Sequence, residues 1–407
     1  MLRFIEPAKE LPVYGKYDTV VVGGGFAGIA AAVAAARGGN KVLLCERMFI
    51  LGGLGTAGLV TIYLPLCDGR GNQLSFGLAE ELLKVSIEYG YEQGYPRAWL
   101  EGGTQEEKEK QRYRVRYNAS ACAIAMEKLL LKEGVEILYG TTVCDVAVTD
   151  DMITHLLIEN KGGRSAVEVG NVVDCSGDAD VCYYAGEDTA EYAVGNNLAA
   201  WYYHFNGEGN ALRMLGFNDD PEARARRSEH DKKSITTLKH FRGLDGKDLT
   251  EMTIESHATV YNHFLKDQKL SKEHMLTSIA SIPQVRMTRR IDGVTVLDWS
   301  DDYVRFEDSV GMFGNWNSSG PTENKGEKWE LPYTALYGRK IKNLAAAGRC
   351  LSATDKMWDI TRVIPVCSLS GEAAGTAAAL AKNFCDVDVA LLQQTLQNNG
   401  VMIHWEQ

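Results

Sequence analysis

The order of hydrophobic and polar positions near the start of the chain predicts a strand, a turn, a helix and a second strand. Residues 19–22 form a β-branched run of the kind found in buried parallel strands. Residues 27–37 are nearly all alanine, which allows a helix to lie close to a sheet. A second apolar run ends at Glu46. This succession is typical of a βαβ unit in a parallel sheet.

The turn of this unit carries a candidate nucleotide site. Gly23, Gly25 and Gly28 fit the frame G-x-G-x-x-G, in which the glycines allow a tight turn, close approach of backbone to pyrophosphate and close helix packing. The N–H groups at the start of the helix favour phosphate. Glu46 follows about 20 residues later, where a carboxylate accepts hydrogen bonds from both ribose hydroxyls and disfavours a 2′-phosphate. An accidental glycine turn is the weaker interpretation.

Further patterns predict the elements that follow. Asn118 is a suitable N-cap for a helix over residues 119–132. Alternating positions over 141–148 and 152–159 predict a hairpin, with residues 150–151 in its turn.

The character of the chain changes between about residues 190 and 330. Alanine becomes sparse, aromatic and charged residues take over, and a long polar helix is predicted over 248–269. We expect an antiparallel sheet here. After residue 340, small residues such as alanine and glycine are again frequent. A strand is predicted over 344–347 and a helix over 370–381. A dinucleotide fold that closes so late indicates that the middle of the chain is inserted into it.

The predicted organisation is therefore a nucleotide-binding domain in two pieces, residues 1–189 and 331–407, with an inserted substrate or cap domain over residues 190–330.

Composition narrows the class of protein. The chain has 407 residues and a net charge of −11, which argues against nucleic acid or an anionic membrane as partner. No apolar run reaches the roughly 18 residues that span a bilayer, and the N-terminal segment lacks the apolar core of a signal peptide. The nine cysteines contain no C-x-x-C pair, which predicts reduced thiols in a cytoplasmic protein and no common zinc or iron–sulfur frame.

Four motifs carry a resemblance to a known family. They are D-T-V-V-V-G-G-G-F-A-G-I-A-A-A with E-R at 46–47, L-G-G-L-G-T-A-G-L, V-V-D-C-S-G-D-A-D-V at 172–181, and N-L-A-A-A-G-R-C at 343–350 continuing into the small-residue segment at 362–381. Together they resemble the bacterial FAD-dependent oxidoreductases of the glutathione-reductase class, relatives of the fumarate reductase and succinate dehydrogenase flavoproteins.

The resemblance implies an α/β fold, with a Rossmann-like FAD-binding domain and an inserted α+β substrate lobe that contains an antiparallel sheet. Phe26 stands where the family usually has proline, and Cys175-Ser176 replaces the usual Ala-Thr. Neither change removes a glycine. The family's histidine tether has no match, so we expect FAD to bind non-covalently.

The cofactor contacts that the resemblance implies follow the four motifs. Glu46 would hold the adenosine ribose, the first glycine turn the pyrophosphate, Val143 the adenine through its backbone, and the last motif the flavin. The full set is Gly23, Gly24, Gly25, Phe26, Ala27, Gly28, Glu46, Arg47, Gly53, Leu54, Gly55, Thr56, Val143, Ser176, Gly177, Gly348, Arg349, Val363 and Ile364.

Arginines are the first candidates for substrate contacts. Arg362 precedes the helix expected to face the flavin, where a guanidinium could clamp an anion; a structural bridge to Asp355 or Asp359 is the alternative. Arg289 belongs to a crowded stretch, residues 285–291, which we expect to form one strand with Arg286 and Arg290 on one face and Arg289 on the other. One of these three arginines could lie near the flavin, although surface ion pairs are the more common explanation for such a cluster.

Two further residues are catalytic candidates. His204 lies in an aromatic strand and could act as a general acid or base, although a satisfied core histidine is the more common case. Trp358 could stack on flavin or substrate, or simply pack in the core.

The predicted function is hydride transfer between flavin and a small organic substrate, either dehydrogenation of an alcohol or amine or reduction of a polarised C=C bond. An electron donor or acceptor is implied as a second partner, and an oligomer is possible. The alternatives are a redox-neutral flavoenzyme and a non-catalytic FAD-binding regulatory protein. The aromatic-rich insertion favours an enzyme, because a scaffold does not need a second wall over the flavin.

Overall fold

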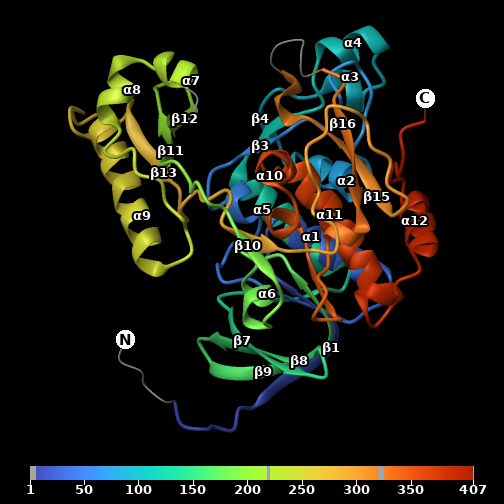
Figure 1. Ribbon diagram of the computed structural model, residues 1–407. Coiled ribbons are helices and arrows are strands. Elements are labelled where there is room, and N and C mark those ends of the chain that lie inside the picture. Colours follow the sequence, from blue (N-terminus) through green and yellow to red (C-terminus); the bar gives the residue numbers. More distant parts are fainter. Residues whose placement is uncertain (1–5, 218–220, 320–324, 407) are drawn as a thin grey trace.

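A seven-stranded sheet forms the centre of the computed structural model, which describes residues 6–217, 221–319 and 325–406 (Figure 1). The strand order is β6-β2-β1-β9-β8-β7, and β17 also pairs with β9. The strands are β1 (Val13–Val22), β2 (Val42–Cys45), β6 (Glu136–Leu138), β7 (Thr142–Thr149), β8 (Met152–Asn160), β9 (Gly163–Asp174) and β17 (Leu344–Ala346).

The long strand β9 joins the parallel and antiparallel parts of this sheet. Its first half pairs antiparallel with β8, and its last residues pair parallel with β17, while β1 runs parallel to it along the other side. The hairpin predicted from alternation is confirmed, with Asp150 and Asp151 at φ 50° and 61° in its turn. Because β1, β2, β9 and β17 are mutually parallel, their carboxyl ends meet at one edge.

Two helices made of small residues cover one face of the sheet. These are α1 (Phe26–Arg37) and α11 (Ile364–Leu380). A Cβ added at Gly371 would lie 2.1 Å from the carbonyl oxygen of Ala27, and one at Gly375 would lie 2.2 Å from that of Ala31. The helix backbones therefore touch, which explains the runs of alanine and glycine in both segments.

Other helices complete the same layer and the opposite face. Helix α2 (Leu78–Ser86) and helix α5 (Ala119–Lys132) pack beside α1 and α11. The Asn118 side chain accepts a hydrogen bond from the Ala121 N–H, so the predicted N-cap is confirmed. The opposite face is buried under α6 (Asp180–Tyr184) and the hairpin.

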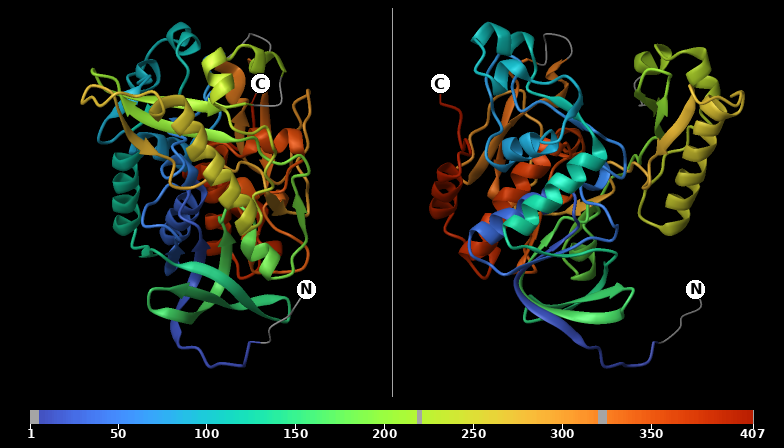
Figure 2. Two further views of the ribbon diagram at one scale, coloured as in Figure 1. Left: turned by 90° about the vertical axis from the view of Figure 1, so that its left-hand side faces the viewer. Right: turned by 180° about the vertical axis from the view of Figure 1, so that it is seen from behind.

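A group of elements from the middle of the chain stands beside this body in Figures 1 and 2. It contains an antiparallel sheet in the order β12-β11-β13, as the family resemblance implied. Its elements are β11 (Ala199–Phe205), β12 (Asn210–Gly216), β13 (Met275–Ile279), α7 (Pro221–Ala225), α8 (Glu229–Ser234) and α9 (Gly246–Val260). The predicted polar helix begins at Gly246, and its last part, Tyr261–Leu265, is a π-helical turn.

The predicted strand over residues 285–291 is wrong for its first half. Only Arg289–Ile291 forms a strand, β14, which pairs with β10 (Thr189–Glu191). The N–H groups of Arg286 and Met287 instead donate to the Asn196 side-chain oxygen, so they are not available to a sheet partner.

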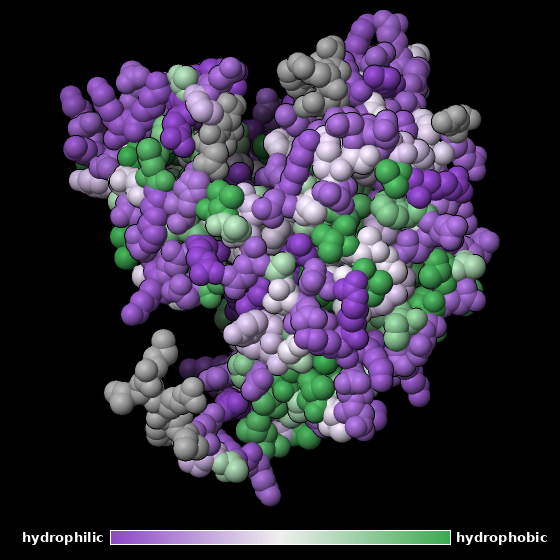
Figure 3. Space-filling view, in the orientation of Figure 1, coloured by the Kyte–Doolittle hydropathy of each residue, from purple (hydrophilic) through white to green (hydrophobic). Residues whose placement is uncertain are grey.

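Smaller elements fill the rest of the body. They are β3 (Ile62–Tyr63), β4 (Tyr91–Gln93), β5 (Val115–Tyr117), β15 (Ser309–Gly314), β16 (Lys328–Pro332), α3 (Arg97–Leu100), α4 (Gln105–Lys110), α10 (Asp355–Thr361) and α12 (Val389–Asn398). Figure 3 shows a mainly hydrophilic face with scattered hydrophobic residues. In the described ranges no single helix is long and apolar enough to span a bilayer; α10 and α11 pass that test only as a pair, and they are bent by 88°.

Candidate active site

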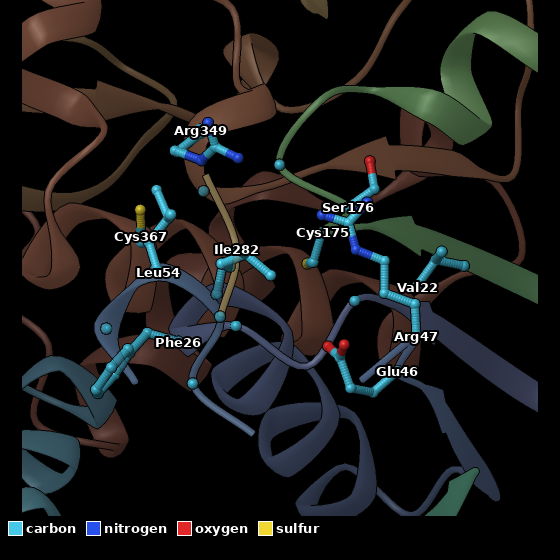
Figure 4. Close-up of a pocket in the computed structure, with 18 of the residues that line it drawn as sticks. Val22, Phe26, Glu46, Arg47, Leu54, Cys175, Ser176, Ile282, Arg349 and Cys367 are labelled. Carbon is cyan, nitrogen blue, oxygen red and sulfur yellow. The ribbon is translucent and has the colours of Figure 1, made fainter. Parts of the chain in front are cut away.

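One large cavity opens at the edge where the parallel strands end (Figure 4). Its floor comes from the ends of β1, β2, β9 and β17, and the N-terminus of α11 closes one side. Two further segments form much of the walls, residues 52–64 with some gaps and residues 282–286 without Gln284. Residues 141–143 and three residues of α6 also line the space. Several parts of the chain that are distant in sequence therefore meet around one space.

The three glycines of the first turn serve different purposes. A Cβ at Gly28 would lie 1.8 Å from the Gly23 carbonyl oxygen, and one at Gly23, where φ is 103°, would lie 2.4 Å from that of Cys175. These two positions are fixed by packing. A Cβ at Gly25 would meet nothing within 4 Å, yet Gly25 lines the cavity. The free space in front of this backbone fits a phosphate group at the start of α1.

Glu46 is buried at the end of β2, with 6% of its surface exposed. One carboxylate oxygen accepts from the Gly24 N–H at 2.7 Å and the other from the Met48 N–H at 2.7 Å. Burial raises the pKa of this carboxyl group, and both hydrogen bonds act in the opposite direction. Each oxygen retains a second lone pair, so the group can also accept from a ligand hydroxyl.

The other end of the cavity is built by the segment after β17. Gly348, at φ 74°, donates its N–H to the Ser370 hydroxyl at 2.9 Å. The Arg349 guanidinium donates to the carbonyl oxygens of Val285, at 2.7 Å, and Arg286, at 3.2 Å. Arg349 thus ties the segment after β17 to a wall segment some sixty residues earlier in the chain.

The first turn of α11 faces the same space. Val363 is the N-cap residue, and its side chain makes no capping hydrogen bond. Val363, Ile364 and Cys367 line the cavity. The positive end of the helix dipole and its free N–H groups therefore point toward any ligand that binds there.

Most of the residues expected to contact a cofactor line this cavity; the exceptions are Gly24, Gly28 and Thr56. Each of these three supports the wall from behind. The Gly24 N–H is bonded to Glu46, Gly28 packs on Gly23, and the Thr56 hydroxyl donates to the Leu51 carbonyl.

Some lining residues were not anticipated from the sequence. They include apolar side chains of two segments, Val60, Ile62, Leu64, Ile282, Pro283 and Val285, and three residues of α6, Asp180, Val181 and Tyr184. Arg286, one of the three arginines of which one was considered for a place near the flavin, also lines the cavity. No local signal marks these segments, because their role depends on a long-range approach.

The structure separates the four catalytic candidates. Arg362 lines the cavity, and its guanidinium Nε donates to Asp359 at 2.9 Å, so a bridge to Asp359 exists as well. Trp358 is 1% exposed, and its indole N–H donates to the Arg349 carbonyl at 2.7 Å. Arg289 pairs with Asp180 at 2.7 Å. Trp358 and Arg289 lie outside the set of cavity-lining residues.

His204 belongs to the separate lobe rather than to the cavity. It lies on β11, with its ring 5.8 Å from that of Tyr202 and 5.0 Å from that of Phe264, centroid to centroid. Burial lowers its pKa from the ordinary histidine value. Its surroundings are those of an aromatic cluster.

The parallel sheet, the glycine turn and the cavity at the strand ends define an α/β protein with a Rossmann-like nucleotide-binding unit. More specifically, residues 18–229 and 199–396 match the model of the family described as FAD dependent oxidoreductase. The chain belongs to this family, and FAD is its cofactor. The resemblance that the four motifs indicated is thereby confirmed at the level of the family.

Comparison with individual proteins gives more distant similarities. A stretch of 76 residues is 36% identical to the thioredoxin reductase of Ureaplasma parvum serovar 3; it covers 19% of this chain and 25% of that protein. The chain therefore spans about a quarter of the length of this curated relative.

Two solved structures extend over nearly the whole chain. A geranylgeranyl bacteriochlorophyll reductase-like protein of Thermoplasma acidophilum is 14% identical, with a TM-score of 0.44 and coverage of 95% of this chain and 82% of that one. The anhydrotetracycline hydroxylase of Streptomyces rimosus is 12% identical, with a TM-score of 0.44 and coverage of 94% and 65%.

Proposed function

We propose that this protein is an oxidoreductase that transfers hydride between a non-covalently bound FAD and a small organic substrate. The observation that carries the proposal is that one cavity brings together three parts of the chain. It joins the nucleotide-type turn at Gly23 and Gly25 to the uncapped N-terminus of α11, and it is walled on the remaining side by residues 282–286. This third wall would enclose a reaction partner beside the cofactor.

The residues present fit the cofactor along the whole cavity. Glu46 would accept from the ribose, the backbone at Gly25 would approach the pyrophosphate, and Val143 would meet the adenine. Gly348, Val363 and Ile364 would lie near the flavin. The α11 N-terminus would stabilise negative charge that develops on the ring during reduction. When bound, FAD supplies the capacity to accept and donate hydride.

The protein's own side chains would position substrate and exclude water. Ile62, Leu64 and Val285 give the cavity apolar walls, which strengthen electrostatic interactions inside by displacing solvent. Arg362 offers a fork of donors at the end of α10, where it could polarise a carbonyl or clamp an anion.

Two alternatives remain compatible with FAD binding: a redox-neutral flavoenzyme and a regulatory protein that binds FAD without turnover. The wall formed by residues 282–286 favours an enzyme, because binding FAD alone does not require it.

Anaerobic photoreduction followed by mixing with oxygen, quinones and disulfides tests the proposal. We expect rapid reoxidation by at least one acceptor class, and bleaching of the oxidised flavin by a substrate from a panel of alcohols, amines and acids. A flavin that neither bleaches nor reoxidises faster than free FAD would contradict it.

A further inference from the structure

The acids that line the cavity in the described part of the chain, Glu46 and Asp180, both have partners. Glu46 accepts from two backbone N–H groups, and Asp180 forms an ion pair with Arg289. Beside α10 and α11 the cavity instead presents three guanidinium groups, those of Arg286, Arg349 and Arg362. Of these, Arg362 forms an ion pair with Asp359, and Arg349 forms one with Asp178 at 3.5 Å. The guanidinium of Arg286 has no ion pair among the described residues.

Arg286 is held in place by its backbone. Its N–H donates to the Asn196 side-chain oxygen at 2.7 Å, and its carbonyl accepts from Arg349 at 3.2 Å. Its guanidinium lies 5.7 Å from the centre of the Trp201 ring. Across residues 6–217, 221–319 and 325–406, no carboxylate lies within ion-pair distance of this group and no hydrogen bond of its guanidinium is found.

The surroundings of Arg286 make an anion the natural ligand. Burial lowers its pKa to about 10; the positive charge of Arg362 acts in the same direction, and the Asp359 carboxylate, which is beyond ion-pair distance, acts in the opposite one. The side chain is therefore still cationic at neutral pH, in a place where its charge is poorly solvated. An anion bound there would restore the lost solvation energy. The planar fork of a guanidinium matches a carboxylate in shape.

We propose that the substrate is a small organic monocarboxylate with an apolar body, whose carboxylate is bound by Arg286. The apolar body would contact the remaining walls of the same part of the cavity, which are Val60, Ile62, Leu64, Ile282 and Val285. This inference rests on the proposed function and names its substrate class. It differs from the role of Arg362, whose guanidinium already has an acidic partner.

The test measures ligand binding to the FAD-loaded protein. Binding is monitored through changes in the visible absorbance spectrum of the flavin. The probes are acetate, butyrate, hexanoate and benzoate, each with its primary amide as a neutral match. We expect the acids to perturb the spectrum, with affinity rising up to roughly fourfold for each added methylene group. The amides should bind much more weakly. Arg286→Gln should weaken acid binding on the order of 10- to 100-fold, and Arg286→Lys should restore it only in part.

Arg290→Gln is the matched control, since it removes a charge from the same stretch at a residue that does not line the cavity and pairs with Asp292. It should bind the acids as the wild type does. The inference is overturned if no acid binds the wild type, if Arg286→Gln binds within threefold of it, or if both variants weaken equally. It is also overturned if Arg286→Gln changes FAD affinity or flavin potential while acid binding stays normal, because Arg286 would then serve the cofactor.

This measurement is independent of turnover. A protein that binds FAD and the acids but fails the photoreduction and substrate tests would refute the proposed oxidoreductase function alone. A protein that reacts with neutral substrates and ignores the acids would refute only the substrate class.

Discussion

At the scale of single residues, the glycines of the first turn meet two requirements, close packing within the protein and free space for a ligand. The sequence alone does not show which glycine meets which requirement. Gly23 and Gly28 are fixed by contacts within the protein, whereas Gly25 faces open space in the cavity. All three glycines fit the same motif, so the motif predicts a turn beside the cavity but not which glycine is free to face a ligand.

This difference gives a prediction for Gly25→Ala. The added methyl group meets no protein atom within 4 Å and the backbone at Gly25 has an ordinary negative φ of −72°, so we expect an unchanged fold. The methyl group would instead displace a phosphate from the backbone. FAD affinity, measured by fluorescence quenching on titration of the apoprotein, should fall by roughly tenfold or more, the equivalent of about 1.4 kcal/mol.

Gly28→Ala is the counterpart. Its methyl group would collide with the Gly23 carbonyl, so it should lower the melting temperature of the apoprotein itself. Equal stability losses in the two variants would contradict the division of roles.

Arg362 can be tested against its own ion pair. If the guanidinium acts on substrate, Arg362→Ala should slow flavin reduction, or its reoxidation by an acceptor, on the order of 10²–10³-fold. Asp359→Asn removes the bridge but keeps the guanidinium, and should leave these rates within a few-fold of wild type. Rapid-mixing absorbance measures both. If the two variants lose the same activity and the same stability, the bridge is structural and Arg362 has no role in catalysis.

At the scale of elements, helix α11 has two functions. Its N-terminus lines the cavity, and its middle packs on α1 through Gly371 and Gly375. A third contact, Glu372, is buried and accepts the N–H of Leu78 at 2.7 Å, so it links α11 to the first residue of α2. The sequence predicted a helix here from its small residues but gave no reason for a glutamate in its centre.

Burial raises the pKa of Glu372 to about 8, against the effect of the Leu78 hydrogen bond. The unfolded chain releases this proton near pH 4.5, so the folded state binds more protons between about pH 4.5 and 8, and its stability falls as pH rises through that window. Glu372→Gln keeps an acceptor for Leu78 and removes the titration. Compared with wild type in urea unfolding, it should differ little at pH 5 and be more stable at pH 8, by up to a few kcal/mol.

A stability difference between Glu372→Gln and wild type that is the same at both pH values would show that Glu372 does not titrate in this window.

Sequence patterns were sufficient to predict the elements that depend mainly on their own residues. The βαβ unit, the Asn118 cap and the hairpin with its Asp150-Asp151 turn were all predictable. The strand over residues 285–291 was not, because Asn196, some ninety residues earlier, takes the N–H groups of Arg286 and Met287. Alternation in sequence cannot reveal a competitor of this kind.

At the scale of the whole molecule, one part of the cavity is determined by local sequence and another part is placed by residues distant in sequence. The cavity floor follows from motifs at the ends of strands, and those positions could be assigned from sequence. The wall at residues 282–286 is placed by long-range hydrogen bonds: the Ser281 N–H to the Ala57 carbonyl, the Gln284 amide to the Gly58 carbonyl, and Arg349 to Val285. Nothing in the local sequence encodes these partners, so the substrate side remained hidden.

The account rests on FAD being bound non-covalently in this cavity, and the flavin content of the purified protein tests it most directly. The protein is reconstituted with FAD, desalted and precipitated with acid, and the absorbance of supernatant and pellet is compared with the protein concentration. We predict a yellow protein that carries one FAD per chain and releases all of it into the supernatant. A colourless protein after reconstitution, or flavin that stays with the precipitated chain, would contradict the account.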